Sequence, residues 1–162
     1  MFKAGILIMS DKGSRGERED LSSAEIRRML DGFCRFEYYE IIPDEREMIV
    51  ERLRYACDEL KLDILLTSGG TGFSPRDVTP EATLAVVERP APGLSEAIRA
   101  YGMQQTPRAM LSRAAAGIRG KTLIINLPGS VKAVREALEA VLPSLEHGLE
   151  ILTGRTGECG QP

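Results

Sequence analysis

The amino-acid sequence predicts a three-layer α/β/α domain built on a mostly parallel β-sheet. Short apolar runs alternate with longer amphipathic segments, which is typical of a parallel sheet with helices on both faces. The apolar run Asp63–Leu66 leads directly into a glycine-rich loop, as at the carboxyl end of a buried strand. A chain of 162 residues is long enough for one such core. We expect the domain to span residues 1–153 and the tail 154–162 to be flexible.

The first half of the chain is predicted to hold three strands and two helices. The strands are short apolar runs, and the helices have apolar residues at three- and four-residue spacing. The polar, glycine-containing segment Asp11–Asp20 is predicted to be a loop. In chain order the elements are strand Ala4–Met9, helix Leu21–Phe33, strand Phe36–Ile42, helix Glu45–Leu60 and strand Ile64–Thr67.

The second half is predicted to be mainly helical around one strong strand, Thr122–Leu127. Pro80 and the pair Pro92-Gly93 mark the starts of two helices, because proline is well tolerated in the first helical turn. The predicted helices are Pro80–Glu88, Leu94–Tyr101, Val131–Val141 and Leu145–Leu152.

Composition argues against several functional classes. The net charge of −3 provides no general attraction to nucleic acid or to a membrane surface, and the apolar runs are too short to span a bilayer. Three widely spaced cysteines, Cys34, Cys57 and Cys159, and the single His147 argue against a disulfide framework or a zinc site. We therefore expect a protein of the reducing cytoplasm.

The segment between Thr67 and Glu81 is the strongest candidate for a ligand-binding loop. Its glycines Gly69, Gly70 and Gly72 let the backbone turn sharply and present N–H groups to an anionic oxygen. A dinucleotide fingerprint is excluded because position 75 is proline. The Gly120-Lys121-Thr122 triplet is not a P-loop, because it precedes a strand and lacks the required first glycine.

Polar residues follow four predicted strands. If the strand order allows it, these loops converge on one crevice at the carboxyl edge of the sheet. The loops are Ser10-Asp11, Pro43-Asp44, Ser68–Asp77 and Pro128–Ser130.

Two aspartates are candidates for catalysis. Asp77 is left without a capping role, because Thr79 is the predicted N-cap and Pro80 suits the first helical position. Asp44 has two interpretations, since it is also a plausible N-cap in a capping box with Glu47. Two carboxylates beside a backbone phosphate cradle suit nucleotidyl transfer with Mg²⁺.

Two further residues have open alternatives. Arg76 is a candidate for bidentate phosphate binding, or for an ion pair with Asp77 or Glu81. Ser130 is either an ordinary cap of the following helix or a ligand contact.

Three motifs together resemble those of the MogA/MoaB-type molybdopterin-binding family. They are Gly69-Gly70-Thr71-Gly72, then Arg76-Asp77-Val78-Thr79-Pro80-Glu81-Ala82-Thr83, and Asn126-Leu127-Pro128-Gly129-Ser130. The resemblance extends from about Lys3 to Leu152 and is strongest to the MogA-type molybdopterin adenylyltransferases. It implies a MogA-like fold and a role in molybdenum cofactor biosynthesis. The implied reaction is Mg-ATP-dependent adenylylation of molybdopterin with release of pyrophosphate.

The resemblance also assigns site residues. It implies that Asp77 and Asp44 are catalytic and position Mg²⁺. The implied contacts to molybdopterin and ATP are Ser10, Asp11, Ser68, Gly69, Gly70, Thr71, Gly72, Arg76, Asn126, Pro128, Gly129 and Ser130. It further implies a homotrimer and transient contact with a molybdenum-insertion protein. The alternative is a MoaB-like protein that binds pterin or nucleotide without adenylyl transfer.

Overall fold

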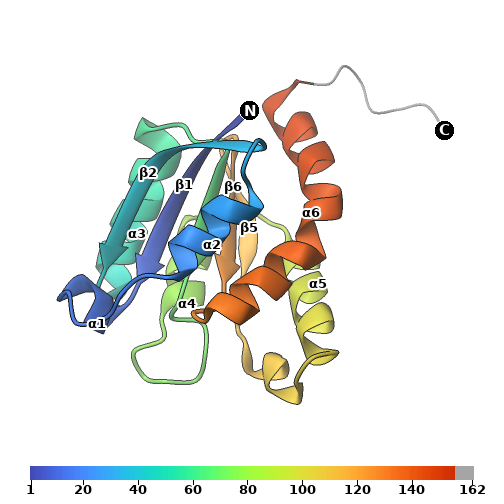
Figure 1. The fold of residues 1–162 in the computed structure, drawn as a ribbon. Coiled ribbons are helices and arrows are strands. Elements are labelled where there is room, and N and C mark those ends of the chain that lie inside the picture. Colours follow the sequence, from blue (N-terminus) through green and yellow to red (C-terminus); the bar gives the residue numbers. More distant parts are fainter. Residues whose placement is uncertain (156–162) are drawn as a thin grey trace.

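A computed structural model describes residues 1–155. Its six-stranded sheet lies between two layers of helices (Figure 1). The strand order is β2-β1-β3-β6-β5-β4. Strands β2, β1, β3 and β6 pair in parallel, and β5 and β4 add an antiparallel edge. This confirms the predicted fold class. The strands are β1 (Phe2–Met9), β2 (Cys34–Ile42), β3 (Ile64–Ser68), β4 (Arg89–Pro90), β5 (Ala116–Arg119) and β6 (Thr122–Leu127).

The helices cover both faces of the sheet. Their bounds are α1 (Asp11–Ser14), α2 (Ser22–Met29), α3 (Arg46–Arg54), π-helix η1 (Tyr55–Glu59), α4 (Thr79–Val86), α5 (Pro92–Met103), 3-10 helix η2 (Pro107–Leu111) and α6 (Val131–Thr153). Helices α2, α5 and α6 pack on one face of the sheet, and α3, η1 and α4 on the other. Alternate residues of β1 point to opposite faces of the sheet. Ile6 and Ile8 therefore join the core under α2, α5 and α6, and Leu7 and Met9 join the core under α3, η1 and α4.

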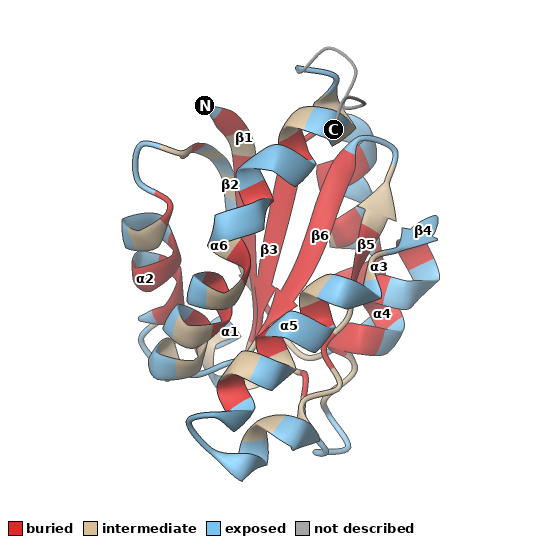
Figure 2. Cartoon of the chain, turned by 90° about the vertical axis from the view of Figure 1, so that its right-hand side faces the viewer, coloured by how far each residue is buried: buried red, intermediate tan, exposed pale blue. Residues whose placement is uncertain are grey.

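The central strands are buried along their whole length, as expected for parallel strands covered on both faces (Figure 2). Their register fixes where the loops begin. Ser68 of β3 pairs with Ile8 of β1 and with Leu127 of β6, and Met9 pairs with Ile42 of β2. The four carboxyl ends therefore lie side by side, and the four predicted polar loops start from one edge.

Three predictions about elements were wrong. Segment 11–20 is not entirely loop, because it contains the short helix α1. The edge strands β4 and β5 were not predicted. The two predicted C-terminal helices form a single helix, α6, which continues through Pro143. Pro143 is exposed, so the missing backbone hydrogen bond faces solvent while Leu138, Val141 and Leu145 stay packed in the core.

Helix α6 is capped at its C-terminus by Gly154, whose φ of 72° is the left-handed conformation favoured by glycine. Arg155 still contacts the domain: its guanidinium pairs with Asp63 at 2.9 Å and lies over the ring of Phe2. The rest of the expected tail, 156–162, lies outside the described residues, as does Cys159. Within residues 1–155, no helix is both long enough and apolar enough to cross a membrane.

Candidate active site

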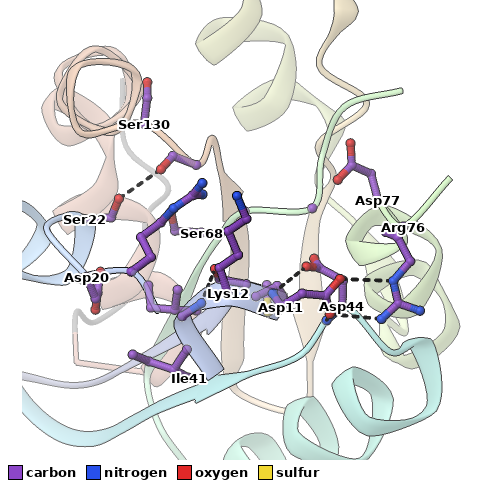
Figure 3. A pocket seen from close by; sticks show the side chains of 18 of the residues that line it. Asp11, Lys12, Asp20, Ser22, Ile41, Asp44, Ser68, Arg76, Asp77 and Ser130 are labelled. Carbon is purple, nitrogen blue, oxygen red and sulfur yellow. Dashed lines mark hydrogen bonds and ion pairs between the residues drawn. The ribbon is translucent and has the colours of Figure 1, made fainter. Parts of the chain in front are cut away.

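A pocket of about 660 Å³ opens where the loops after β1, β2, β3 and β6 meet (Figure 3). Asp44, Asp77 and Arg76 lie at one end, Asp20, Ser22 and Ser130 at the other, and Lys12 lies between them. The sequence-predicted residues that line this pocket are Ser10, Asp11, Asp44, Ser68, Gly69, Gly70, Arg76, Asp77, Gly129 and Ser130. The structure therefore brings together most of the predicted site.

The glycine loop needs glycine for both conformation and space. Gly69 and Gly70 have φ values of 97° and 68°, a conformation that side-chain-bearing residues rarely adopt. A Cβ atom at Gly69 would collide with the carbonyl oxygen of Met9. At Gly70 it would collide with the hydroxyl of Thr79 and lie 3.0 Å from a carboxylate oxygen of Asp44.

This loop leaves backbone donors available for a ligand. The Gly69 N–H donates to the carbonyl of Leu127 at 3.2 Å, which ties the loop to β6. Within the described part of the chain, the N–H groups of Gly70, Thr71 and Gly72 have no acceptor. Consecutive unpaired N–H groups in such a turn attract an anionic oxygen.

Thr79 has a different role from the predicted one. It was expected to be the N-cap of α4, but Val78 occupies that position and no side chain caps the helix. The hydroxyl of Thr79 instead donates to the carbonyl of Gly69 at 3.0 Å, and its N–H donates to that of Gly70 at 3.1 Å. Thr79 therefore holds the glycine loop in place through the carbonyls of Gly69 and Gly70.

The capping interpretation of Asp44 is wrong. Glu45 occupies the N-cap position of α3, without a side-chain capping bond. Asp44 instead exchanges hydrogen bonds with Asp11. The Asp11 N–H donates to Asp44 Oδ2 at 3.1 Å, and the Asp44 N–H donates to Asp11 Oδ1 at 3.0 Å. This pair joins the loops after β1 and β2 and holds both carboxylates at the pocket.

The two carboxylates have opposite pKa shifts. Burial raises the pKa of Asp44, and the negative charges of Asp11 and Asp77 raise it further. The pKa of Asp11 is lowered, mainly by its hydrogen bonds from the guanidinium of Arg76. Asp44 is therefore an anion at a place that disfavours negative charge and would be stabilised by a cation.

Asp77 is positioned by its own turn. Its Oδ2 accepts from the N–H of Ser74 at 3.0 Å, and its N–H donates to the carbonyl of Ser74 at 2.9 Å. Among the described residues, no donor reaches Oδ1 of Asp77 or Oδ1 of Asp44. One oxygen of each carboxylate thus remains available at the pocket.

Arg76 pairs with neither of its predicted carboxylate partners, Asp77 and Glu81. Its guanidinium bridges Asp11 and Glu45, with Nη2 at 2.9 Å from an oxygen of each. The side chain is half exposed, so these pairs add little stability. Only a small free energy therefore holds Arg76 to these two carboxylates.

The loop after β6 forms the opposite wall. Ser130 caps α6, since its Oγ accepts from the Ala133 N–H at 3.2 Å, which confirms the capping interpretation. The hydroxyl of Ser68 donates to the carbonyl of Pro128 at 2.7 Å, and that of Ser22 donates to Gly129 at 3.2 Å. These contacts fix the wall relative to β3 and α2.

Four predicted site residues do not line the main pocket. Thr71, Gly72 and Pro128 border a second, mainly apolar hollow of about 290 Å³ next to α5 and α6. Asn126 borders neither and is fully buried. Its amide donates to the hydroxyls of Thr67 and Thr83, both at 2.9 Å, and accepts from the Ala115 N–H at 3.1 Å. Asn126 therefore supports the loops from inside the domain, and its predicted contact with a ligand stays a prediction.

Sequence reasoning missed two cations at the pocket, Lys12 and Arg18. Both are exposed, and neither has a carboxylate within ion-pair distance among residues 1–155. Their signal in the sequence was the presence of basic side chains in the polar segment 11–20 that follows the first strand. Lys12 and Arg18 therefore add positive charge to a pocket that also contains Asp44 and Asp77.

Comparison with known proteins identifies the family. The family described as "Probable molybdopterin binding domain" matches residues 5–147. A molybdopterin adenylyltransferase from Helicobacter pylori is 45% identical over 154 residues, covering 93% of this chain and 87% of that protein. The Escherichia coli K12 protein of the same name is 38% identical over 143 residues, covering 86% and 73%.

Solved structures agree with this result. A structure from Thermus thermophilus, described as the molybdopterin biosynthesis enzyme MoaB, has a TM-score of 0.91 and 54% identity. The match covers 95% of this chain and 98% of that one. A structure of MogA has a TM-score of 0.88 and 37% identity, with 93% and 99% covered. The chain therefore belongs to the molybdopterin-binding domain family of molybdenum cofactor biosynthesis.

Proposed function

We propose that this protein is a molybdopterin adenylyltransferase. A terminal phosphate oxygen of molybdopterin attacks the α-phosphorus of ATP and forms the new P–O bond. The bond from that phosphorus to the bridging oxygen breaks, and pyrophosphate leaves. The products are adenylyl-molybdopterin and pyrophosphate. Relatives named for this activity support the proposal.

The observation that carries the proposal is the pairing of two kinds of group in one pocket. The glycine loop presents the unpaired N–H of Gly70 in the pocket that also contains Asp44 and Asp77. Phosphoryl transfer requires positioning and charge stabilisation rather than a covalent protein nucleophile, and these groups provide both. Lys12 and Arg18 add positive charge that suits the phosphates of ATP and the departing pyrophosphate.

The carboxylates fit Mg²⁺ bound together with substrate. Asp44 and Asp77 each have one oxygen without a hydrogen-bond donor, and burial and repulsion raise the pKa of Asp44. Within residues 1–155, no cluster of three or more His, Cys, Asp or Glu forms a ready-made cage. Mg²⁺ commonly binds through one or two carboxylates together with substrate phosphates and waters. When bound, it would neutralise phosphate charge.

The chain's own residues then position the reactants. Asp44 and Asp77 would hold Mg²⁺ against the phosphates, and the unpaired N–H of Gly70 donates to a phosphate oxygen. Arg76 exchanges its carboxylate partners for phosphate. No protein group needs to remove a proton, because the attacking phosphate oxygen is already largely ionised at neutral pH.

A second candidate is binding of pterin or nucleotide without transfer. The 54% identity to a structure described as MoaB favours keeping this alternative. Both candidates require the pocket, but only adenylyl transfer requires it to release pyrophosphate.

The remaining parts of the proposal concern the setting of the reaction. We place the protein in the cytoplasm and propose transfer of the product to a molybdenum-insertion protein. We also propose a homotrimer, consistent with three exposed apolar side chains at the end of α5 and on η2: Met103, Met110 and Leu111. Sedimentation velocity tests the assembly directly, since a monomer at micromolar concentration would contradict it.

The activity is tested by incubating the protein with molybdopterin and Mg-ATP and separating the pterin products chromatographically. We expect an adenylylated pterin and an equal amount of pyrophosphate. Asp77→Asn keeps the shape of the side chain but removes its charge, so the folded variant should bind nucleotide and lose nearly all turnover. Full turnover by folded Asp77→Asn would end the proposed role of this carboxylate.

A further inference from the structure

Arg113 is not a pocket residue, yet it holds the pocket's central loop. It lies in the segment between η2 and β5, and its side chain is about one-third exposed, at 35%. Its N–H donates to the carbonyl of Thr71 at 2.8 Å. Its Nε donates to the carbonyl of Gly72 at 2.9 Å, and Nη2 donates to that of Asp77 at 2.8 Å.

The Arg113 guanidinium bonds both ends of the loop from Gly72 to Asp77. Gly72 and Asp77 are the first and last residues of the turn that carries Arg76 and the Asp77 carboxylate. A third guanidinium donor, Nη1, pairs with Glu81 in the first turn of α4. Bonds from a charged donor are about twice as strong as those between neutral groups, and the planar guanidinium fixes their directions.

The segment that carries Arg113 is itself anchored. Arg99 donates to the carbonyl of Ala114 at 2.9 Å. The buried amide of Asn126 accepts from the Ala115 N–H, and the Asn126 N–H donates to the Ala115 carbonyl at 3.0 Å. A chain of hydrogen bonds therefore runs from the carboxyl end of β6 through Arg113 to the loop of Asp77.

We propose that Arg113 is a positioning residue for adenylyl transfer. It sets the separation of Gly72 and Asp77, and thereby the place of the Asp77 carboxylate in the pocket, without touching substrate. This inference rests on the proposed function. It explains why an arginine outside the pocket directs three donors at the glycine loop and the start of α4.

The test compares Arg113→Met and Arg113→Lys with a matched control, Arg119→Met. Arg119 is also partly buried and donates to a backbone carbonyl, that of Val86 at 3.1 Å, but its other partner is Asp58, remote from the pocket. Three quantities are measured for every variant: steady-state kinetics, thermal stability, and hydrogen exchange of the Ser74 and Asp77 amides, which bond within the loop.

We expect Arg113→Met to lower kcat roughly 10- to 100-fold, as misplacement of a reacting group does, with little change in the KM for molybdopterin. Exchange at Ser74 and Asp77 should accelerate. Arg113→Lys should remain impaired, because one ammonium does not reproduce the fork that spans both carbonyls. Arg119→Met should lose some thermal stability while keeping parental kcat and loop exchange.

Parental kcat together with parental loop exchange in Arg113→Met would overturn the inference. So would a kcat loss in Arg119→Met equal to that in Arg113→Met, because the effect would then follow stability alone. If the parent protein transfers no adenylyl group, the proposed function fails. Hydrogen exchange at Ser74 and Asp77 then decides whether Arg113 positions the loop. Faster exchange confined to the Arg113 variants supports the positioning role, and unchanged exchange refutes it.

Discussion

Asn126 provides a sharp test of the difference between a buried support and a ligand contact. Its side chain is fully buried and makes three hydrogen bonds, two to threonine hydroxyls and one from the Ala115 N–H. Asn126→Ala removes all three. A net hydrogen bond contributes about 1 kcal/mol, so the free energy of unfolding should fall by about 3 kcal/mol.

The loss should be visible in both chemical and thermal unfolding. For a domain of this size, about 1 kcal/mol corresponds to roughly 2–4 °C, so the Tm should fall by about 6–12 °C. Thr83→Val removes a single bond to the same amide and should lower the unfolding free energy by about 1 kcal/mol. ATP affinity, titrated well below the Tm, should stay near the parental value for both variants. Parental stability combined with weakened ATP binding in Asn126→Ala would refute the assignment of a buried support.

Three other variants test individual groups of the pocket. Folding raises the pKa of Asp44 above 3.8, so its stabilising contribution is complete below that pH and is lost as pH rises through the folded-state pKa. Asp44→Asn should therefore be more stable than the parent at pH 7, but not near pH 3, and turn over more slowly; a neutral-pH stability loss would contradict this. Gly70→Ala should lose about 1–2 kcal/mol in urea unfolding from its left-handed backbone alone, and parental stability would contradict that strain. Lys12→Gln should raise the KM for ATP, and more so at low salt than at high salt. The control Lys121→Gln changes an exposed lysine remote from the pocket and should leave the KM unchanged. A parental KM for ATP in Lys12→Gln would remove Lys12 from the site.

The part of the fold that was predictable is the part that local pattern encodes. Strands such as Ile64–Ser68 are continuous apolar runs because both faces are covered, so their identity is evident in the sequence. The β4–β5 edge was not predictable, since Arg89–Pro90 is too short and polar to stand out as a strand. The rule that proline ends a helix failed for α6, because Pro143 faces solvent, where a missing backbone hydrogen bond costs less than in a core.

The candidate site also contains residues that could be predicted from the sequence and residues whose roles could not. The glycines and the two aspartates were identifiable because residues of these types gather in loops that follow strands. The uses of Asp44 and Asn126 depend on partners that lie far away in sequence, such as Asp11 for Asp44 and Thr67 for Asn126. Such pairings become visible only once the strand order places the loops side by side.

The central claim is that this pocket transfers an adenylyl group to molybdopterin rather than merely binding it. The most direct measurement follows label from ATP carrying ³²P at the α-position, incubated with molybdopterin, Mg²⁺ and the parent protein or Asp77→Asn. We expect the label to move into a pterin product with the parent, in step with pyrophosphate release, and Asp77→Asn to almost abolish this movement. Label that stays in ATP while molybdopterin and ATP both bind the parent would contradict adenylyl transfer and establish a binding protein instead.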